Sequence, residues 1–153
     1  MVIEELGRDD RSCAEAVALW RACGLTRPWN DPMPDLVRAL EGPSSTVLVA
    51  RDRAAGEAQV TGTVMVGHDG HRGWVYYLAV APDRRGHGLG RELMAAAETW
   101  LAERGVPKIQ LMIRAGNASV RAFYEALGYA DQEVIVMGRS FDQSLNAARS
   151  AGN

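Results

Sequence analysis

A glycine-rich turn, Arg85-Gly86-His87-Gly88-Leu89-Gly90, has the residue types and spacing to bind an anion. It stands between an apolar run typical of a strand and the start of an amphipathic helical pattern, where the first backbone N–H groups have no intrahelical partner. Its alternating glycines remove the side chains that would keep a ligand away from those amides. Because the amides lie at the positive end of the helix dipole, a pyrophosphate is the expected ligand, although the same glycines could serve only close packing.

Two common nucleotide sites do not fit this turn. A P-loop would continue with Gly-Lys-Ser/Thr, whereas Gly90 is followed by Arg91 and Glu92. A dinucleotide-binding turn has the spacing Gly-x-Gly-x-x-Gly and an acidic residue about 20 positions further on. The spacing here is Gly-x-Gly-x-Gly, and residues 110–113 contain no acid.

The turn instead resembles the Arg/Gln-x-x-Gly-x-Gly/Ala motif of the GNAT superfamily of N-acetyltransferases, matched by Arg85, Gly88 and Gly90. Residues 117–129 resemble the second motif of that family, Asn-x-x-Ala/Val followed by Phe-Tyr-x-x-x-Gly-Phe/Tyr. Residues 27–32 and 67–73 are further similar to a small bacterial subgroup. The resemblance implies an enzyme that moves an acetyl group from acetyl-CoA to a primary amine of a small metabolite, by direct attack in a ternary complex and without a metal.

The resemblance also implies which residues hold the coenzyme. The backbone at Leu78 and Val80 is expected to pair with the pantetheine arm, whose amides suit a strand edge. The Asn117 side chain is expected to contact the same arm, unless it only caps the helix that follows. The pyrophosphate is expected at the glycine-rich turn, formed by Arg85, Gly86, His87, Gly88, Leu89, Gly90 and Arg91.

For catalysis, Tyr124 matches the family's usual general acid, which protonates the departing thiolate of coenzyme A. The alternative is that Tyr124 only packs in the core, because Val120, Phe123 and Leu127 share its helical face. The family's usual carboxylate base is missing, since residues 74–77 and 110–112 include no acid. The proton acceptor could instead be one of four candidates: Asp31, Asp69, His68 or His71.

The acceptor pocket is expected to be lined by Trp29, Asn30 and Asp31 of a proline-rich loop, together with Tyr76 and Tyr77. Two other functions stay open. One is acetylation of a protein N-terminus or lysine. The other is a non-catalytic acyl-CoA sensor, which the missing base would favour.

Local patterns predict the elements that must position these residues. Helical spacing predicts helices around residues 13–20, 36–40, 89–101 and 118–127. Apolar runs bounded by turn residues predict strands at 2–6, 46–50, 59–66, 74–80, 108–113 and 133–139. The order β-α-α-β-β-β-α-β-α-β predicts a mixed α/β fold, with a mostly antiparallel sheet flanked by helices in one domain, residues 1–141. Residues 142–153 are expected to form a flexible tail.

Composition limits the partners. The net charge is −2, and Arg84-Arg85 is too short a basic patch for nucleic acid. No apolar stretch approaches the roughly 20 residues of a membrane span, so a cytoplasmic protein is expected. Cys13 and Cys23, about 15 Å apart on one predicted helix, are too distant for a disulfide. The oligomeric state is left open, a homodimer being one option.

Overall fold

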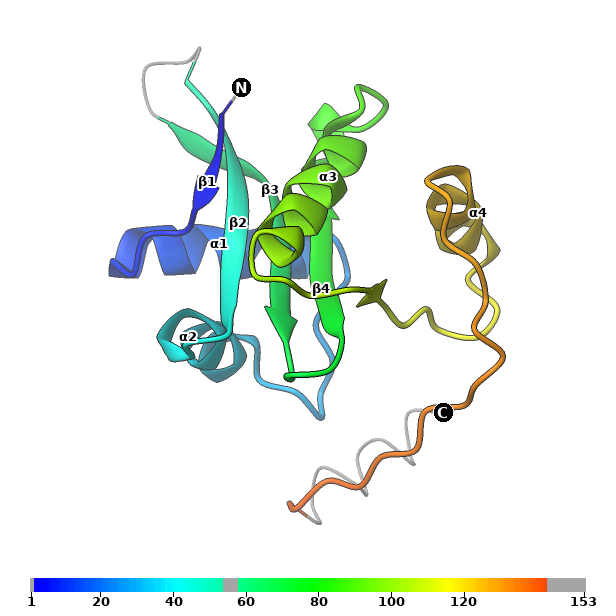
Figure 1. Ribbon diagram of the computed structural model, residues 1–153. Coiled ribbons are helices and arrows are strands. Elements are labelled where there is room, and N and C mark those ends of the chain that lie inside the picture. Colours follow the sequence, from blue (N-terminus) through cyan, green and yellow to red (C-terminus); the bar gives the residue numbers. More distant parts are fainter. Residues whose placement is uncertain (1, 54–57, 143–153) are drawn as a thin grey trace. The chain divides into compact units, whose positions relative to one another are not determined.

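The computed structural model describes residues 2–53 and 58–142 of the chain, so the predicted tail lies almost wholly outside the described residues. The chain forms two compact units, Met1–Leu111 and Met112–Asn153. Figure 1 shows the elements of both.

The first unit is built on a five-stranded sheet in the order β1-β2-β3-β4-β5. The first four strands pair antiparallel with their neighbours, α1 and α2 standing between β1 and β2 in the chain, and β5 adds to β4 in parallel. This confirms the predicted mixed and mostly antiparallel sheet. The strands are β1 (Val2–Glu5), β2 (Ser45–Asp52), β3 (Gln59–His68), β4 (Gly73–Val80) and β5 (Ile109–Gln110).

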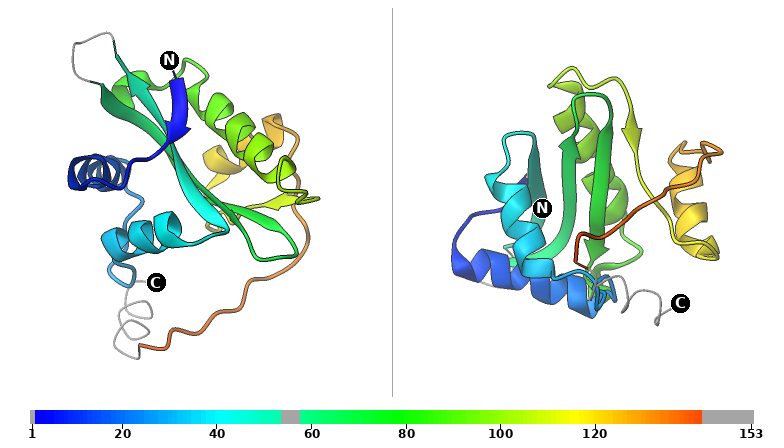
Figure 2. Two further views of the ribbon diagram at one scale, coloured as in Figure 1. Left: turned by 60° about the vertical axis from the view of Figure 1, so that its left-hand side comes forward. Right: turned by 90° about the horizontal axis from the view of Figure 1, so that it is seen from below.

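Helices cover both faces of this sheet, as Figure 2 shows. The helices are α1 (Asp10–Ala22), α2 (Pro32–Glu41) and α3 (Leu89–Ala102), with a short 3₁₀ turn, η1 (Pro82–Arg84), before α3. On β3, a Cβ at Gly62 would lie 2.8 Å from Leu93 of α3. The next residue, Thr63, accepts a hydrogen bond from Trp20 of α1 on the opposite face. Because successive strand residues point to opposite faces, α1 and α3 lie on opposite sides of the sheet.

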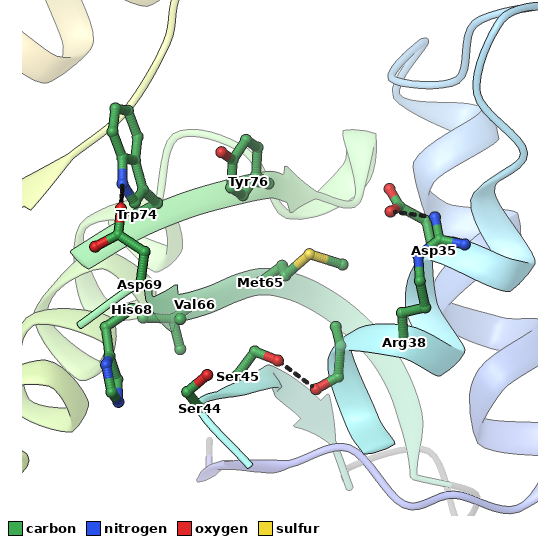
Figure 3. A pocket seen from close by; sticks show the side chains of 12 residues that line it. Asp35, Arg38, Ser44, Ser45, Met65, Val66, His68, Asp69, Trp74 and Tyr76 are labelled. Atoms are coloured by element: carbon green, nitrogen blue, oxygen red, sulfur yellow. Dashed lines mark hydrogen bonds and ion pairs between the residues drawn. The ribbon is translucent and has the colours of Figure 1, made fainter. Parts of the chain in front are cut away.

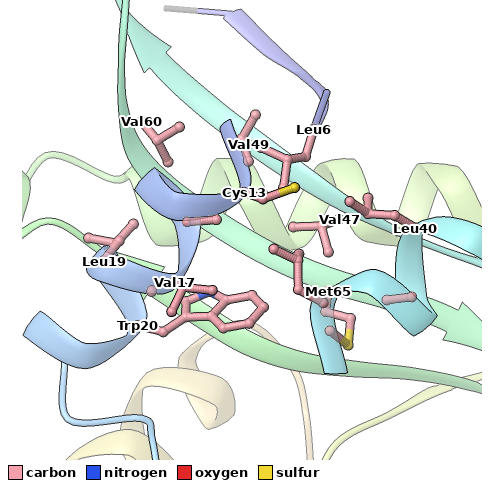
Figure 4. Close-up of a cluster of buried hydrophobic side chains, with 14 residues drawn as sticks. Leu6, Cys13, Val17, Leu19, Trp20, Leu40, Val47, Val49, Val60 and Met65 are labelled. Atoms are coloured by element: carbon pink, nitrogen blue, oxygen red, sulfur yellow. The ribbon is translucent and has the colours of Figure 1, made fainter. Parts of the chain in front are cut away.

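The core between α1, α2 and the sheet is apolar and closely packed (Figure 4). Trp20 and Leu36, one from each helix, are fully buried in it. Both helices begin at aspartates that cap them, as Asp9 accepts from the Ser12 amide (2.9 Å) and Asp31 from the Met33 amide (3.3 Å). Local capping and apolar spacing therefore explain why these helices form where the sequence predicts them.

The second unit contains α4 (Ala118–Ala126), which the sequence predicts, but the predicted strand at residues 133–139 is wrong. Within the described residues this segment has no strand pairing, and its side chains are exposed, with Ile135 at 85%. Its apolar run satisfies the composition of a strand, but a strand also needs a neighbour to accept its backbone hydrogen bonds. The predicted strand at 108–113 is likewise reduced to the two residues of β5.

The described residues bear on three expectations from the sequence, which concern a disulfide, a membrane span and a metal site. Cys13 and Cys23 are both free, with Cys13 buried, in agreement with the prediction that they do not bridge. None of the helices in the described ranges combines the length and apolarity that crossing a membrane requires. Nor do these ranges contain a group of three or more histidine, cysteine or acidic side chains able to hold a metal ion.

Candidate active site

The glycine-rich turn leads from η1 into α3 and is open to solvent. Gly86 and Gly88 both have φ near +81°, and Gly88 is the N-cap of α3 without any capping side chain. The helical ladder starts with the Glu92 amide donating to the Gly88 carbonyl oxygen (3.1 Å). The amides of residues 89–91 come before that bond, so they are the N-terminal donors of α3. These amides belong to the turn at which the sequence predicts an anion site.

Leu89 and Arg85 have further roles in this turn. The Leu89 side chain is buried against the sheet, which leaves only its backbone for a ligand. The Arg85 guanidinium donates to the Val80 carbonyl oxygen (3.3 Å), and that oxygen also accepts from the Cys23 thiol (3.4 Å). Arg85 thus ties the turn to the end of β4.

Strand β4 carries a β-bulge at Tyr77 and Leu78. Met65 pairs with Tyr76 and Thr63 with Ala79, so two residues of β4 lie opposite Val64 alone. Tyr77 has φ +52°, an uncommon value for a bulky residue. The bulge breaks the alternation of side chains, and both Tyr76 and Tyr77 reach the face that α2 covers, where they lie near Asp35.

Beyond the bulge, one edge of β4 has no strand beside it in the described part of the chain. The parallel pairing with β5 covers only Gly73↔Ile109 and Trp74↔Gln110. Leu78 and Val80, predicted to face the pantetheine arm, lie past the end of this pairing. A polar chain could therefore add to this edge as a further strand does.

A pocket of about 310 Å³ opens on the α2 face of the sheet, as Figure 3 shows. Asp35 and Arg38 of α2 lie at one end, and Asp69, His68 and Trp74 lie at the other. Met65 and Tyr76 come from the strands between the two ends. The remaining lining residues are Ala39, Ser44, Ser45, Val66 and Gly67. All of these residues belong to the first unit.

A hydrogen-bonded cluster fixes the Asp35 end of the pocket. The Tyr77 hydroxyl donates to Asp35 Oδ2 (2.8 Å) and accepts from Asn30 Nδ2 (2.8 Å), which also donates to Asp35 (3.1 Å). The Tyr77 ring stacks on Trp20 with centroids 3.8 Å apart. Burial and the neighbouring Asp35 carboxylate raise the pKa of Tyr77 far above its usual value, so its hydroxyl stays protonated and acts as a donor to Asp35.

The structure thus brings together three of the five predicted acceptor residues. Tyr76 lines the pocket, and Asn30 and Tyr77 hold its Asp35 end. Trp29 and Asp31 do not line this pocket, and Asp31 serves as the N-cap of α2. The sequence patterns do not indicate Asp35, because it belongs to no motif and reaches the tyrosines only when α2 packs on the bulged strand. In the sequence, only the position of Asp35 in the first helical turn after the proline-rich loop could have indicated that it belongs to the site.

Of the other predicted proton acceptors, His68 and Asp69 line the pocket, whereas His71 does not. Asp69 instead holds the hairpin between β3 and β4. Its Oδ1 accepts from the His71 and Arg72 amides (2.9 and 2.8 Å), and its Oδ2 accepts from Trp74 Nε1 (3.2 Å). These bonds, chiefly those from the two amides, lower the pKa of Asp69 to about 2, which makes it a poor base.

An Asp69→Asn variant should therefore change the acid stability of the protein. Hydrogen bonds to the ionised carboxylate contribute stability that is complete above the ordinary pKa of 3.8 and is lost as the pH falls towards about 2. We expect the variant to melt below the wild type at neutral pH, and the difference to shrink across that window. Melting temperatures measured from neutral pH downwards check this. A difference that stays constant with pH would contradict a role for the charge.

In the second unit, Asn117 caps α4 by accepting from the Val120 amide (3.3 Å) and the Ser119 hydroxyl (3.3 Å). Tyr124 is buried, with its ring edge-on to Phe123 and Tyr129 at centroid distances of 5.0 and 5.7 Å. Burial raises the pKa of Tyr124 to about 12. Both side chains therefore have a structural role in this unit, whatever they contact in a complex.

The fold combines a mixed sheet with a glycine-rich turn that leads into a helix, and comparisons with known proteins identify its class. Residues 14–129 match the model of the acetyltransferase (GNAT) family. The chain belongs to this family and is an acetyl-CoA-dependent N-acetyltransferase. Acetyl-CoA is the co-substrate of the family, as the sequence predicts.

Two bacterial relatives cover most of the chain. The acetyltransferase SG1711 of Sodalis glossinidius is 46% identical over 126 residues, 82% of this chain and 86% of that protein. The acetyltransferase YE1169 of Yersinia enterocolitica is 43% identical over 125 residues, with the same coverage of each chain.

Solved structures share the fold at low identity. A putative acetyltransferase from Agrobacterium tumefaciens has a TM-score of 0.73 at 17% identity, covering 92% of this chain and 100% of that one. AAC(6')-Iy, in complex with the bisubstrate analogue CoA-S-monomethyl-acetylneamine, has a TM-score of 0.73 at 14% identity, covering 92% and 99%. At such identities the likeness concerns the fold alone.

Proposed function

We propose that the protein acetylates a primary amine of a small metabolite, which attacks acetyl-CoA directly while both are bound. The observation that carries this proposal is the arrangement along β4. The pocket at Tyr76 and the free strand edge at Leu78 are two residues apart, about 7 Å along a strand. An acceptor in the pocket and a pantetheine arm on the edge could thus be bound together and meet near Tyr77.

The coenzyme is proposed to lie along the residues that the family resemblance indicates. The amides of the glycine-rich turn would hold the pyrophosphate, the edge at Leu78 and Val80 would pair with the pantetheine arm, and Asn117 would contact that arm. At Val80 the arm would replace the bond from Arg85 to the carbonyl oxygen. Tyr124 would donate a hydrogen bond to the departing sulfur.

Direct attack is favoured over an acetylated enzyme because neither cysteine lines the pocket. Cys13 is buried, and burial raises the pKa of its thiol further above the usual value. Ser45 of the pocket offers no better nucleophile, since it donates its hydroxyl to the Ala39 carbonyl oxygen (2.9 Å). A structure of this fold with a bisubstrate analogue of CoA further supports a complex that holds both substrates.

The pocket volume favours a small acceptor. A volume of about 310 Å³ lies at the lower end of the range for small-molecule sites. A peptide acceptor would need an extended groove around this pocket. A small amine is therefore favoured over a protein N-terminus or lysine, and the apolar pocket with two carboxylates favours an enzyme over a sensor.

The test is a panel of alkylamines, aromatic amines, amino acids and short peptides, assayed by release of the coenzyme thiol. We expect turnover with one or more small amines, little with peptides, and intersecting initial-velocity patterns, because both substrates must be bound before products leave. Parallel patterns would contradict direct attack. Turnover confined to peptides would support protein acetylation, and none with any acceptor would support the sensor.

A further inference from the structure

Two carboxylates line the pocket, and each accepts three hydrogen bonds, but only Asp35 accepts one of them from an exposed arginine side chain that a substrate can displace. Asp69 accepts three hydrogen bonds from its own hairpin. The hairpin therefore uses this carboxylate for its own structure. Asp35, at the other end of the pocket, is partly exposed, with 27% of its side-chain surface accessible.

We propose that Asp35 binds the ammonium group of the acceptor in this pocket and takes the first proton from it, an inference that rests on the proposed function. A carboxylate has about four acceptor positions, two on each oxygen. Oδ2 is filled by the Tyr77 hydroxyl and Asn30. Oδ1 accepts from Arg38 Nη2 (3.0 Å), which leaves it one position for an N–H group of a substrate.

The surroundings keep this carboxylate oriented. Tyr77 and Asn30 approach Oδ2 from β4 and from the loop before α2, so the oxygen that they leave open has a fixed direction. Tyr77 itself is held by stacking on Trp20 and by the Thr63 hydroxyl, which donates to its carbonyl oxygen (2.9 Å). Because these contacts restrict the rotation of the Asp35 carboxylate before a ligand arrives, the entropic cost of binding a ligand is lower.

Arg38 does not block the site. It lies three residues from Asp35 on α2, and 68% of its side-chain surface is exposed. Exposed ion pairs of this kind contribute little stability, so an incoming ammonium can displace the guanidinium into solvent. In the free protein Arg38 balances the charge of Asp35, and in the complex the substrate does so.

The chemistry of the lining indicates the class of acceptor. Behind the charged end lie Met65, Ala39 and the ring of Tyr76, which suit a short apolar chain. An acceptor with an anionic group next to that chain would approach Asp69 at the far end. The pocket therefore fits a primary amine on a short apolar or weakly polar carbon chain.

The proposed reaction is balanced in atoms and charge. The bound ammonium gives one proton to Asp35, which passes it to water. The neutral nitrogen forms a bond to the carbonyl carbon of the acetyl thioester, and the carbon–sulfur bond breaks. The sulfur leaves as a thiolate and takes up the equivalent of the second proton that the nitrogen loses. The products are the N-acetylated amine, coenzyme A as its thiol, and one proton in solution.

The experiment compares the wild type with Asp35→Asn, which keeps the shape of the side chain but removes its charge. Glu41→Gln is the matched control, since it removes one carboxylate from the exposed end of the same helix. Binding is followed by NMR titration with n-butylammonium chloride, and with 1-butanol as a neutral probe of similar length. Turnover of the best amine from the panel is measured on the same samples, and melting temperatures report any loss of folding.

We expect n-butylammonium to shift resonances of pocket residues in the wild type and in Glu41→Gln. In Asp35→Asn its dissociation constant should rise roughly 10- to 100-fold, the loss expected for a hydrogen bond to a charged group. The weak binding of 1-butanol should be unchanged, which a variant with a collapsed pocket would not show. The value of kcat should also fall, because the proton acceptor is lost.

Several results would overturn the inference. These are n-butylammonium binding outside the pocket or not at all, equal affinity in Asp35→Asn, and unchanged kcat and KM in that variant. If no amine of the panel is acetylated but Asp35 still selects n-butylammonium over 1-butanol, the proposed function fails and the amine site stands. If turnover is normal without Asp35, the function stands and this inference fails.

Discussion

A Gly88→Val variant is expected to stay folded and to lose measurable binding of acetyl-CoA. Gly88 has φ +81° at the N-cap of α3, a backbone conformation that a β-branched residue adopts only with strain. A Cβ there would meet no other atom within 4 Å, so the position has open space for the start of a side chain. The strain would instead move the turn, and the side chain would stand beside the amides proposed to hold the pyrophosphate.

Isothermal titration calorimetry measures this loss directly. A second measurement is the melting temperature with increasing acetyl-CoA, because a ligand at 100 times its dissociation constant stabilises a protein by about 2.7 kcal/mol. The wild type should show this increase and Gly88→Val should not. ATP and NAD, which lack the pantetheine arm, should raise the melting temperature of the wild type much less.

Gly105→Val is the matched control for backbone strain. Gly105 follows the other end of α3 and has φ +73°, and a Cβ added there would likewise meet no atom within 4 Å. It should lose about as much stability as Gly88→Val, on the order of 1–2 kcal/mol, but keep its affinity for acetyl-CoA. Near-native affinity in folded Gly88→Val, or an equal loss in Gly105→Val, would contradict the placement of the pyrophosphate.

The parts of the fold that the sequence predicts well are set by local physical chemistry. Asp9 and Asp31 cap their helices, and Gly88 opens α3 with a conformation that favours glycine. The pairing of β3 with β4 follows from two apolar runs separated by a short turn, which Asp69 stabilises. Each of these features depends on residues close together in the chain, so the local sequence pattern is enough to predict it.

The parts that the sequence does not predict depend on partners distant in the chain. The alternation of apolar and polar residues along a strand does not predict the bulge in β4. The bulge is fixed by the register of β4 against β3 and by Trp20, which stacks on Tyr77. Asp35 becomes a pocket residue only through α2, which brings it to that bulge. The apolar residues 133–139 have strand composition, but whether they form a strand depends on a neighbouring edge.

The difference between local and distant partners also applies to the catalytic base that the family resemblance leads one to expect. The usual family positions for this carboxylate, on β4 and β5, hold no acid. The pocket that Tyr76 of β4 lines does have a carboxylate, Asp35, which α2 supplies from 42 positions before Tyr77 in the chain. A missing residue in a motif is therefore weak evidence for lost activity when the fold can bring the same group from elsewhere.

Tyr124→Phe is expected to lower kcat roughly 10- to 1000-fold, as loss of a general acid or of its hydrogen bond commonly does, with little change in affinity for acetyl-CoA. Burial raises the pKa of Tyr124 to about 12, whereas a thiol has a pKa of about 8.5. Full proton transfer to the thiolate is therefore uphill, and in the proposed role the phenol would chiefly donate a hydrogen bond to the charge that develops on sulfur. This proposed interaction would exist only in the transition state, so its loss is expected to lower kcat.

The raised pKa of Tyr124 also predicts how turnover depends on pH. A phenol with a pKa of about 12 keeps its proton throughout the range in which turnover can be measured. Tyr124 therefore gives the wild type no basic limb in its pH–rate profile, and the shape of that profile should be the same in Tyr124→Phe. A basic limb that disappears in the variant would show that the phenol titrates in this range and would contradict the effect of burial.

Tyr129→Phe is the matched control, because it removes a hydroxyl from the ring that packs edge-on against Tyr124. If Tyr124 only packs in the core, Tyr124→Phe should keep near-normal turnover, as Tyr129→Phe should, and any effect should appear in its melting temperature alone. If its hydroxyl assists the departing sulfur, kcat should fall in Tyr124→Phe alone. Measuring kcat and melting temperature on the same preparations separates the two, and wild-type turnover in a destabilised Tyr124→Phe would remove this residue from the mechanism.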